Sequence, residues 1–341
     1  MTDGDGAAGE SMRERGAGSR WRLWLLLDAD RLLLAALLLA GVFCTLVALG
    51  ALADPPLSVL LGRSDPVETL FQALVTAIIT GVTLVVTISQ LVLSQELGAV
   101  GDQRERMAGA MDFRREVEDL VDEPVSPPDP AGFLRAIVAA TGERARAVAD
   151  VAGEIEDGDA RDRVREYAEG VADDADAVTE DLADAQFGTF DVVLAALHFN
   201  YAGKIYEGRR LRERDLPGPV TDRLEDLVTA LTRFGPAREH VKTLYFQWEL
   251  ITLSRTIVYA AVPALVVSVG MILTATEPGS IPGTTLGVEH VVVVVAAATT
   301  VALLPFALLL VYILRIVTVA QRTLAIGPLV LRETDRSGEA E

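Results

Sequence analysis

The sequence predicts an all-α fold, a four-helix integral membrane protein with a cytoplasmic helical domain inserted between spans 2 and 3. Four segments predict the spans, because each is almost free of charge and long enough to cross a hydrocarbon core of ~30 Å, which takes ~20 helical residues. The second observation is where the charge lies. The 341 residues include 49 acidic and 30 basic ones, a net charge of −19, and nearly all of them fall outside the four apolar segments.

Each span is expected to be helical, since backbone N–H and C=O groups have no water partners in lipid. The first span ends at Asp54, because two prolines follow it. The predicted spans cover residues 32–53, 70–93, 256–274 and 290–314. They divide the chain into five parts: a cytoplasmic N-terminal tail (1–31), spans 1 and 2 (32–95), an acidic cytoplasmic helical domain (96–255), spans 3 and 4 (256–315) and a cytoplasmic C-terminal tail (316–341).

The distribution of arginine predicts a multi-pass protein of the cell membrane with both termini in the cytoplasm. Basic residues in short flanking segments remain on the cytoplasmic side. The loop between the first two spans has one such residue, Arg63, and the loop 275–289 has none. Arginines precede the first span and follow the fourth: Arg13, Arg15, Arg20, Arg22 and Arg31, then Arg315, Arg322, Arg332 and Arg336.

The acidic domain reads as helical throughout, with 34 acidic and 20 basic residues between positions 96 and 255. A charged helix, 103–121, is expected to continue the second span, and a proline-rich linker, 123–130, ends it. Apolar residues at steps of three and four predict two helices, 133–155 and 164–182, which the polar turn 156–159 arranges as an antiparallel hairpin. Because the apolar faces of this hairpin are thin, we expect them to need a further surface such as a partner subunit.

The end of the domain predicts two more helices after the segment Pro217-Gly218-Pro219. One is expected over 220–234, and the other begins at Ala237 and runs into the third span. The predicted break between them falls at Gly235 and Pro236, which are both poor helix residues.

A continuous polar stripe on the second span is the most specific candidate site in the chain. Its residues recur at steps of three and four, so they share one face of a helix along the whole span. In one interpretation, copies of this helix from several subunits line a hydrated path, and Glu96 lies at its mouth. In the other, the stripe hydrogen-bonds to neighbouring helices, with Gly81 allowing close approach. The pore-lining candidates are Gln72, Thr76, Thr80, Thr83, Thr87, Gln90 and Ser94.

Two prolines and one basic cluster are secondary candidates. Pro263 and Pro305 lie about equally deep in the third and fourth spans, where they either form hinges or are merely tolerated. The cluster binds anionic lipid head groups or a phosphorylated ligand in one interpretation. In the other, it pairs with the acidic hairpin or compensates a helix C-terminus. Its residues are Lys204, Arg209, Arg210, Arg212 and Arg214.

Motifs for catalysis are absent from the sequence, which has no phosphate-binding glycine loop, no Gly-x-Ser-x-Gly elbow and no zinc-protease motif. Its single cysteine, Cys44, excludes an intrachain disulfide and a cysteine-based metal site. We therefore expect no enzyme activity, no catalytic or metal-ligating residues and no cofactor. The expected partners are membrane lipids and further copies of the chain, with a cytoplasmic protein as an additional candidate and no nucleic acid.

The inner half of the second span carries a limited resemblance. Residues 83–95, TLVVTISQLVLSQ, are similar to the second-span signature of a widespread prokaryotic family of uncharacterised predicted multi-pass membrane proteins, in which a threonine-rich helix ends in Gln-x-x-x-Ser-Gln. Here that end is Gln90, Ser94 and Gln95, and the chain departs from the pattern directly afterwards. The acid-rich composition, with only two lysines, resembles that of proteins from salt-in halophiles such as haloarchaea.

Two functional hypotheses follow. The first is an uncharacterised integral membrane protein that forms a homo-oligomeric, channel-like assembly lined by the polar face of span 2. The second is a non-conducting membrane scaffold or sensor whose cytoplasmic helices bind a partner.

Overall fold

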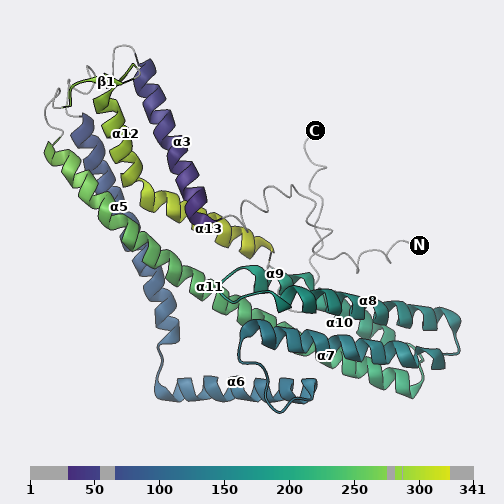
Figure 1. Ribbon diagram of the computed structural model, residues 1–341. Helices are drawn as coiled ribbons and strands as arrows, with labels where there is room; N and C mark the ends of the chain where they lie inside the picture. The colour runs from purple at the N-terminus through teal and green to yellow at the C-terminus, as the bar shows by residue number, and fades with distance from the viewer. Residues whose placement is uncertain (1–29, 54–65, 275–280, 286, 323–341) are drawn as a thin grey trace, which may run out of the picture. The chain divides into compact units, whose positions relative to one another are not determined.

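The computed structural model describes residues 30–53, 66–274, 281–285 and 287–322, and most of them are helical (Figure 1). They form two compact units. The acidic unit is centred on residues 98–246. The apolar unit combines the described residues up to 97 with those from 247 to 319. The all-α prediction is therefore confirmed for the described part of the chain, where the two strands are only two residues long each.

The apolar unit contains the segments expected to cross the membrane. It comprises α3 (Arg31–Leu52), α5 (Pro66–Glu96), the end of α11 (Gly218–Thr274), α12 (His290–Ala302) and α13 (Leu304–Arg322). Asp30 caps α3, because its carboxylate accepts hydrogen bonds from the backbone N–H groups of Leu32 and Leu33. Among the described residues, three helices are long and apolar enough to cross a membrane, namely α3, α5 and α11, and a fourth crossing is reached if the bent pair α12 and α13 counts as one span.

The fourth predicted span is not one straight helix. It is broken at Leu303, where α12 and α13 meet at a bend of 45°. The Leu303 carbonyl accepts from the N–H groups of both Phe306 and Ala307. Pro305 explains the break, because proline has no N–H to donate and its ring clashes with the carbonyl four residues earlier. The predicted span 290–314 is therefore helical on both sides of a kink beside Pro305.

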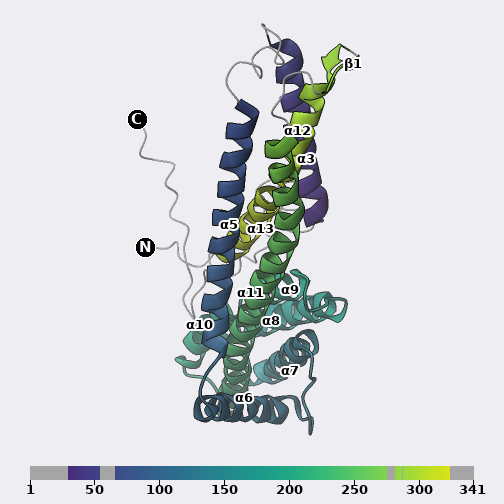
Figure 2. The same ribbon diagram turned by 90° about the vertical axis from the view of Figure 1, so that its left-hand side faces the viewer.

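Small and branched apolar side chains fill the interior of the apolar unit. Phe71 and Ile78 of α5 are fully buried against Ala264 of α11 and Ala298 and Ala302 of α12. Figure 2 shows α12 beside α3, in agreement with the contacts between these two helices. Alanine at the contacts lets the helix backbones approach closely, which is the usual way in which membrane helices pack.

A short β-hairpin precedes α12, in a loop for which the sequence shows no strand pattern. Strand β1 (Thr284–Thr285) pairs antiparallel with β2 (Val288–Glu289). The His290 ring holds this loop, since its Nδ1 donates to the Pro282 carbonyl at 3.1 Å and its Nε2 is 2.7 Å from the Thr285 hydroxyl. Gly283 has a φ of +114°, and a Cβ there would meet the His290 ring at 2.8 Å. Glycine is needed at that position for both reasons.

The acidic unit contains the predicted antiparallel hairpin, which the structure confirms. Helix α7 (Pro130–Val151) and helix α8 (Gly158–Ala183) pack along each other, with a 3-10 turn, η2 (Ala152–Glu154), between them. Asp129 and Asp157 cap the two helices through their side chains. The unit also includes α6 (Val100–Val121), α9 (Asp191–His198), α10 (Tyr201–Arg212) and the first part of α11.

The apolar face of the hairpin is buried within its own chain. Val148 of α7 and Val164 of α8 are fully buried in one core that includes Leu224, Leu227 and Leu231 of α11. The further surface that this face was expected to need is therefore provided within the chain itself, by residues that include those of α11. The thin stripes of alanine and valine suffice because larger side chains from α11 fill the space between the helices.

Two predicted helix boundaries are wrong. The second span does not continue into the charged helix, since residues 97–99 separate α5 from α6 and include Gly98, a poor helix former. Conversely, α11 continues through Gly235 and Pro236 without a break. The Tyr201 ring would lie 2.9 Å from a Cβ at position 235, so glycine there permits close packing, and the buried neighbours Phe234 and Ala237 stabilise the helix across the proline.

Candidate functional site

The polar stripe lies on the outward face of α5. All seven of its residues are exposed in the single chain: Gln72, Thr76, Thr80, Thr83, Thr87, Gln90 and Ser94. The opposite face carries Phe71, Ile78 and Val85, which are buried and follow one another at intervals of seven residues. The stripe therefore makes up no part of the contact between α5 and the other helices of the apolar unit.

The threonine hydroxyls of the stripe are bonded to their own helix. Thr80, Thr83 and Thr87 each donate to the carbonyl oxygen four residues earlier, at 2.8 Å, and Thr76 does the same at 3.0 Å. Ser94 donates to the carbonyl of Leu91 at 2.7 Å. These bonds satisfy every hydroxyl hydrogen of the stripe without a second helix.

The two amides and the acids near the ends of α5 complete the stripe. The Gln72 amide nitrogen donates to the Glu68 carboxylate at 2.9 Å. Gln90 is exposed, and among the described residues its side chain has no hydrogen-bond partner. A carboxamide without a partner is costly in hydrocarbon, at roughly 2–7 kcal/mol. Glu96 is the last residue of α5, and its side chain lies outside the described residues.

Exposed apolar side chains flank the stripe. Ile79, Leu84, Ile88 and Leu91 are all more than half exposed. The outward side of α5 is thus a polar band between apolar borders. In lipid this band would leave the Gln90 amide unsatisfied, and it is better accommodated by water or by the same band of another chain.

The inward face of α5 has one polar contact and one close contact with other helices. Ser89 hydrogen-bonds to Ser254 of α11 through their hydroxyls. A Cβ at Gly81 would lie 3.3 Å from the Phe306 ring of α13, so this glycine allows close approach as expected. Ser89 lies one residue before Gln90 of the stripe, and only the packing shows that its hydroxyl has a different role.

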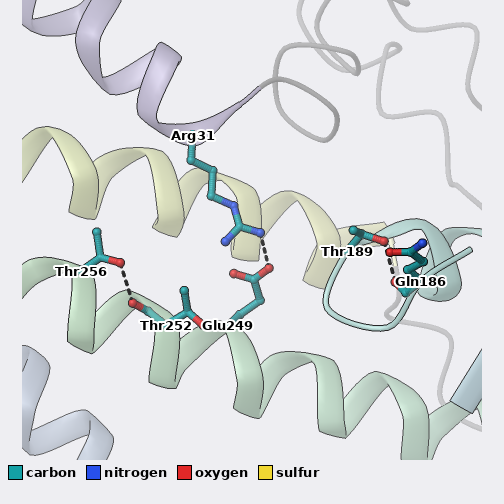
Figure 3. A network of polar contacts seen from close by, with 6 residues as sticks. All are labelled: Arg31, Gln186, Thr189, Glu249, Thr252 and Thr256. Atoms are coloured by element: carbon teal, nitrogen blue, oxygen red, sulfur yellow. Dashed lines mark hydrogen bonds and ion pairs between the residues drawn. The ribbon is translucent and has the colours of Figure 1, made fainter. Parts of the chain in front are cut away.

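A buried ion pair joins the beginning of α3 to α11, and the sequence analysis missed it. Arg31 donates to the Glu249 carboxylate, as Figure 3 shows. The Glu249 side chain is only 1% exposed, and its Oε2 has no hydrogen-bond partner among the described residues. The Arg31 guanidinium also lies 4.8 Å from the centre of the Tyr312 ring of α13. One charge pair therefore ties three helices together at this end of the apolar unit.

The two proline candidates differ in their surroundings. Pro263 lies within α11, which continues past it to Thr274. Pro305 is the second residue of α13, directly after the 45° bend at Leu303. A role as hinges stays a prediction for both.

The side chains of the basic cluster differ in their exposure and contacts. Lys204 contacts Asp174 of the hairpin at 2.5 Å and lies over the Phe199 ring, and Arg212 contacts Glu225 at 3.1 Å. Arg209 and Arg210 are exposed in the last turn of α10, where positive charge is favourable to the helix dipole, and Arg214 is half-buried beyond it. Lipid or phosphate binding by these residues stays a prediction.

Within the described ranges, no group of three or more His, Cys, Asp or Glu residues could hold a metal ion. His198 lies 3.3 Å from Asp181, and His290 belongs to the β-hairpin loop.

The model of the family of unknown function DUF7972 matches residues 1–341. No curated protein and no solved structure matches the chain. The comparisons therefore agree with an uncharacterised family, and the prokaryotic and halophilic character stays an expectation from the sequence.

Proposed function

Since the chain belongs along its whole length to the family of unknown function DUF7972, we propose a function from its own residues: it is a homo-oligomeric, channel-like membrane protein in which copies of α5 surround a hydrated path. The pore-lining residues are the seven of the polar stripe, with Glu96 at the mouth. The protein acts without catalysis.

The exposure of the whole stripe supports this proposal most directly. All seven residues are exposed, and among the described residues the hydrogen bonds of their side chains stay within α5, although packing against a neighbour is the simplest use of a threonine-rich face. Oligomerisation gives the stripe a polar environment, because several copies of one polar face can enclose water whereas one copy cannot. The buried face of α5 meanwhile anchors the helix through Phe71, Ile78 and Val85.

The proposal includes four crossings, with both termini in the cytoplasm of the cell. The bent pair α12 and α13 serves as the fourth crossing, and an even number of crossings returns the chain to the arginine-rich side. A protease accessibility assay tests this topology. Digestion of inside-out vesicles should cut the 96–255 domain, and digestion of intact cells should leave it whole. The reverse pattern would exclude the proposed orientation.

Conductance of the purified protein in planar bilayers tests the path. We expect the wild type to carry current above that of the empty membrane. The double variant Thr83→Leu, Thr87→Leu should lose most of it, since it replaces two central hydroxyls with larger apolar groups. Absence of current from the wild type would exclude a conducting path.

Disulfide crosslinking in native membranes tests the assembly independently. In a Cys44→Ala background, Thr87→Cys places a thiol on the outward face of α5, and oxidation should join two chains into a covalent dimer. Ser89→Cys is the matched control, because Ser89 lies two residues away and contacts Ser254 of its own chain. Equal crosslinking of both variants, or of neither, would contradict an assembly through the stripe.

The non-conducting scaffold is the second candidate, and one observation favours it. Residues 100–112 of α6 are all exposed and include Met107 and Met111, which share one face at a spacing of four. Methionine is adaptable and common at binding surfaces. A protein that carries no current, but loses a copurifying cytoplasmic protein when both methionines are replaced by glutamine, would support this alternative over the channel.

A further inference from the structure

The hydroxyl groups of the stripe present oxygen lone pairs and no free hydrogen to whatever lies beside α5. A backbone carbonyl can only accept, so the hydroxyl hydrogens of Thr76, Thr80, Thr83 and Thr87 must point back to their own helix. Each hydroxyl oxygen keeps its lone pairs on the exposed side. The same holds for Ser94, which donates to Leu91.

The outer end of the stripe has the same polarity. One N–H of the Gln72 amide donates to the Glu68 carboxylate, which leaves the amide oxygen as an acceptor and one further N–H as a donor. From Pro66 to Glu96 the sequence contains two acids, Glu68 and Glu96, and no lysine, arginine or histidine. The face therefore offers an ion mainly partial negative charge.

From this polarity we infer that the path takes monovalent cations and excludes anions. The inference rests on the proposed function, because it assigns a substrate class to the same stripe. A dehydrating cation needs oxygen ligands, which the stripe supplies at every turn of the helix. An anion needs N–H donors or positive charge. The hydroxyl hydrogens along the stripe are committed to the backbone, so only the amide N–H groups of Gln72 and Gln90, near its two ends, could serve an anion.

The absence of carboxylates between Glu68 and Glu96 favours monovalent over divalent cations. Calcium and magnesium ions bind proteins through carboxylates, and magnesium gives up its water reluctantly. Hydroxyl and amide oxygens alone replace the weaker hydration of an ion such as potassium or sodium. The two acids at the ends of α5 raise the local concentration of cations without binding them inside the span.

The reversal potential in planar bilayers tests the inference. With a tenfold gradient of potassium chloride, the current through a path that conducts only potassium reverses at the equilibrium potential of potassium, which is about 59 mV in magnitude. We expect the wild type to reverse close to that value. Replacing the gradient with calcium chloride should abolish the cation current.

A pair of shape-conserving variants assigns the selectivity to the stripe. Thr83→Val, Thr87→Val removes two oxygens at similar volume, and the helix remains intact because its backbone bonds are unchanged. We expect potassium conductance to fall about fivefold for each hydroxyl removed. Thr45→Val is the matched control, since Thr45 is exposed on α3 and makes the same 2.8 Å bond, to the Gly41 carbonyl.

The results distinguish failure of the proposed channel function from failure of the cation inference. A wild type without current overturns the proposed function, and the cation inference with it. A current that reverses near zero, or near the equilibrium potential of chloride, overturns the cation inference alone. If Thr45→Val reduces potassium conductance as much as the double variant does, the stripe does not provide the ligands.

Discussion

The ion pair between Arg31 and Glu249 should respond very differently to the loss of each partner. Removing the arginine leaves a carboxylate that is 1% exposed with neither oxygen paired to a cation, because Oε2 already has no partner among the described residues. Breaking a buried pair in this way costs about 3–5 kcal/mol. We therefore expect Arg31→Met to be one of the most destabilising single substitutions in the apolar unit.

The loss of the carboxylate charge should be milder. Glu249→Gln keeps an oxygen that accepts from Arg31, and the arginine is 19% exposed and retains the Tyr312 ring. The difference between a charged and a neutral hydrogen bond is about 1 kcal/mol. The double variant Arg31→Met, Glu249→Leu should recover most of the stability, because replacing a buried pair with apolar residues of similar size is nearly neutral.

Thermal unfolding of the purified protein in detergent measures these effects. At roughly 2–4 °C per kcal/mol, Arg31→Met should lower Tm by about 6–20 °C. Arg115→Met is the control, since it breaks an exposed pair with Asp112, whose side chains are 66% and 62% exposed, and should cost less than about 1 kcal/mol. Equal effects of Arg31→Met and Glu249→Gln, or additive losses in the double variant, would refute the reasoning.

Two further predictions concern the acidic unit. Gly208→Ala should destabilise it by about 1–3 kcal/mol, because the new Cβ would lie 2.5 Å from the Tyr167 hydroxyl. Gly109→Ala, where a Cβ meets nothing within 4 Å, should stabilise it by about 0.5–1 kcal/mol. Urea unfolding compares the two variants, and changes of the same sign in the free energy of unfolding would contradict the packing. Hydrogen bonds from the Ser126 backbone N–H and hydroxyl lower the pKa of Glu118, so their stabilising effect is present above the usual glutamate pKa and is lost as the pH falls through the lowered folded-state value. Exchange of the Ser126 amide should accelerate over that acidic range in the wild type and be fast at every pH in Glu118→Ala, which has no side-chain acceptor.

The sequence predicted the features that depend on periodicity. Apolar length and charge located the long apolar helices, and steps of three and four predicted both the hairpin and the polar stripe, because one face of a helix is encoded by neighbours in the chain. Local signals were less dependable at helix boundaries. The break around Gly98, between α5 and α6, was not predicted. Gly235 and Pro236, in contrast, leave α11 unbroken, since the packing of Phe234 outweighs the poor helix propensity of the glycine and proline.

The tertiary structure alone decided which way each face points. Periodicity shows that Thr83 and Thr87 lie together, but only the burial of Phe71, Ile78 and Val85 shows that the threonines face outward. Likewise, Arg31 and Glu249 are 218 positions apart, and no local pattern in the chain links them. Contacts between distant segments depend on how the helices pack, and that packing is a property of the whole set of side chains rather than of any one helix.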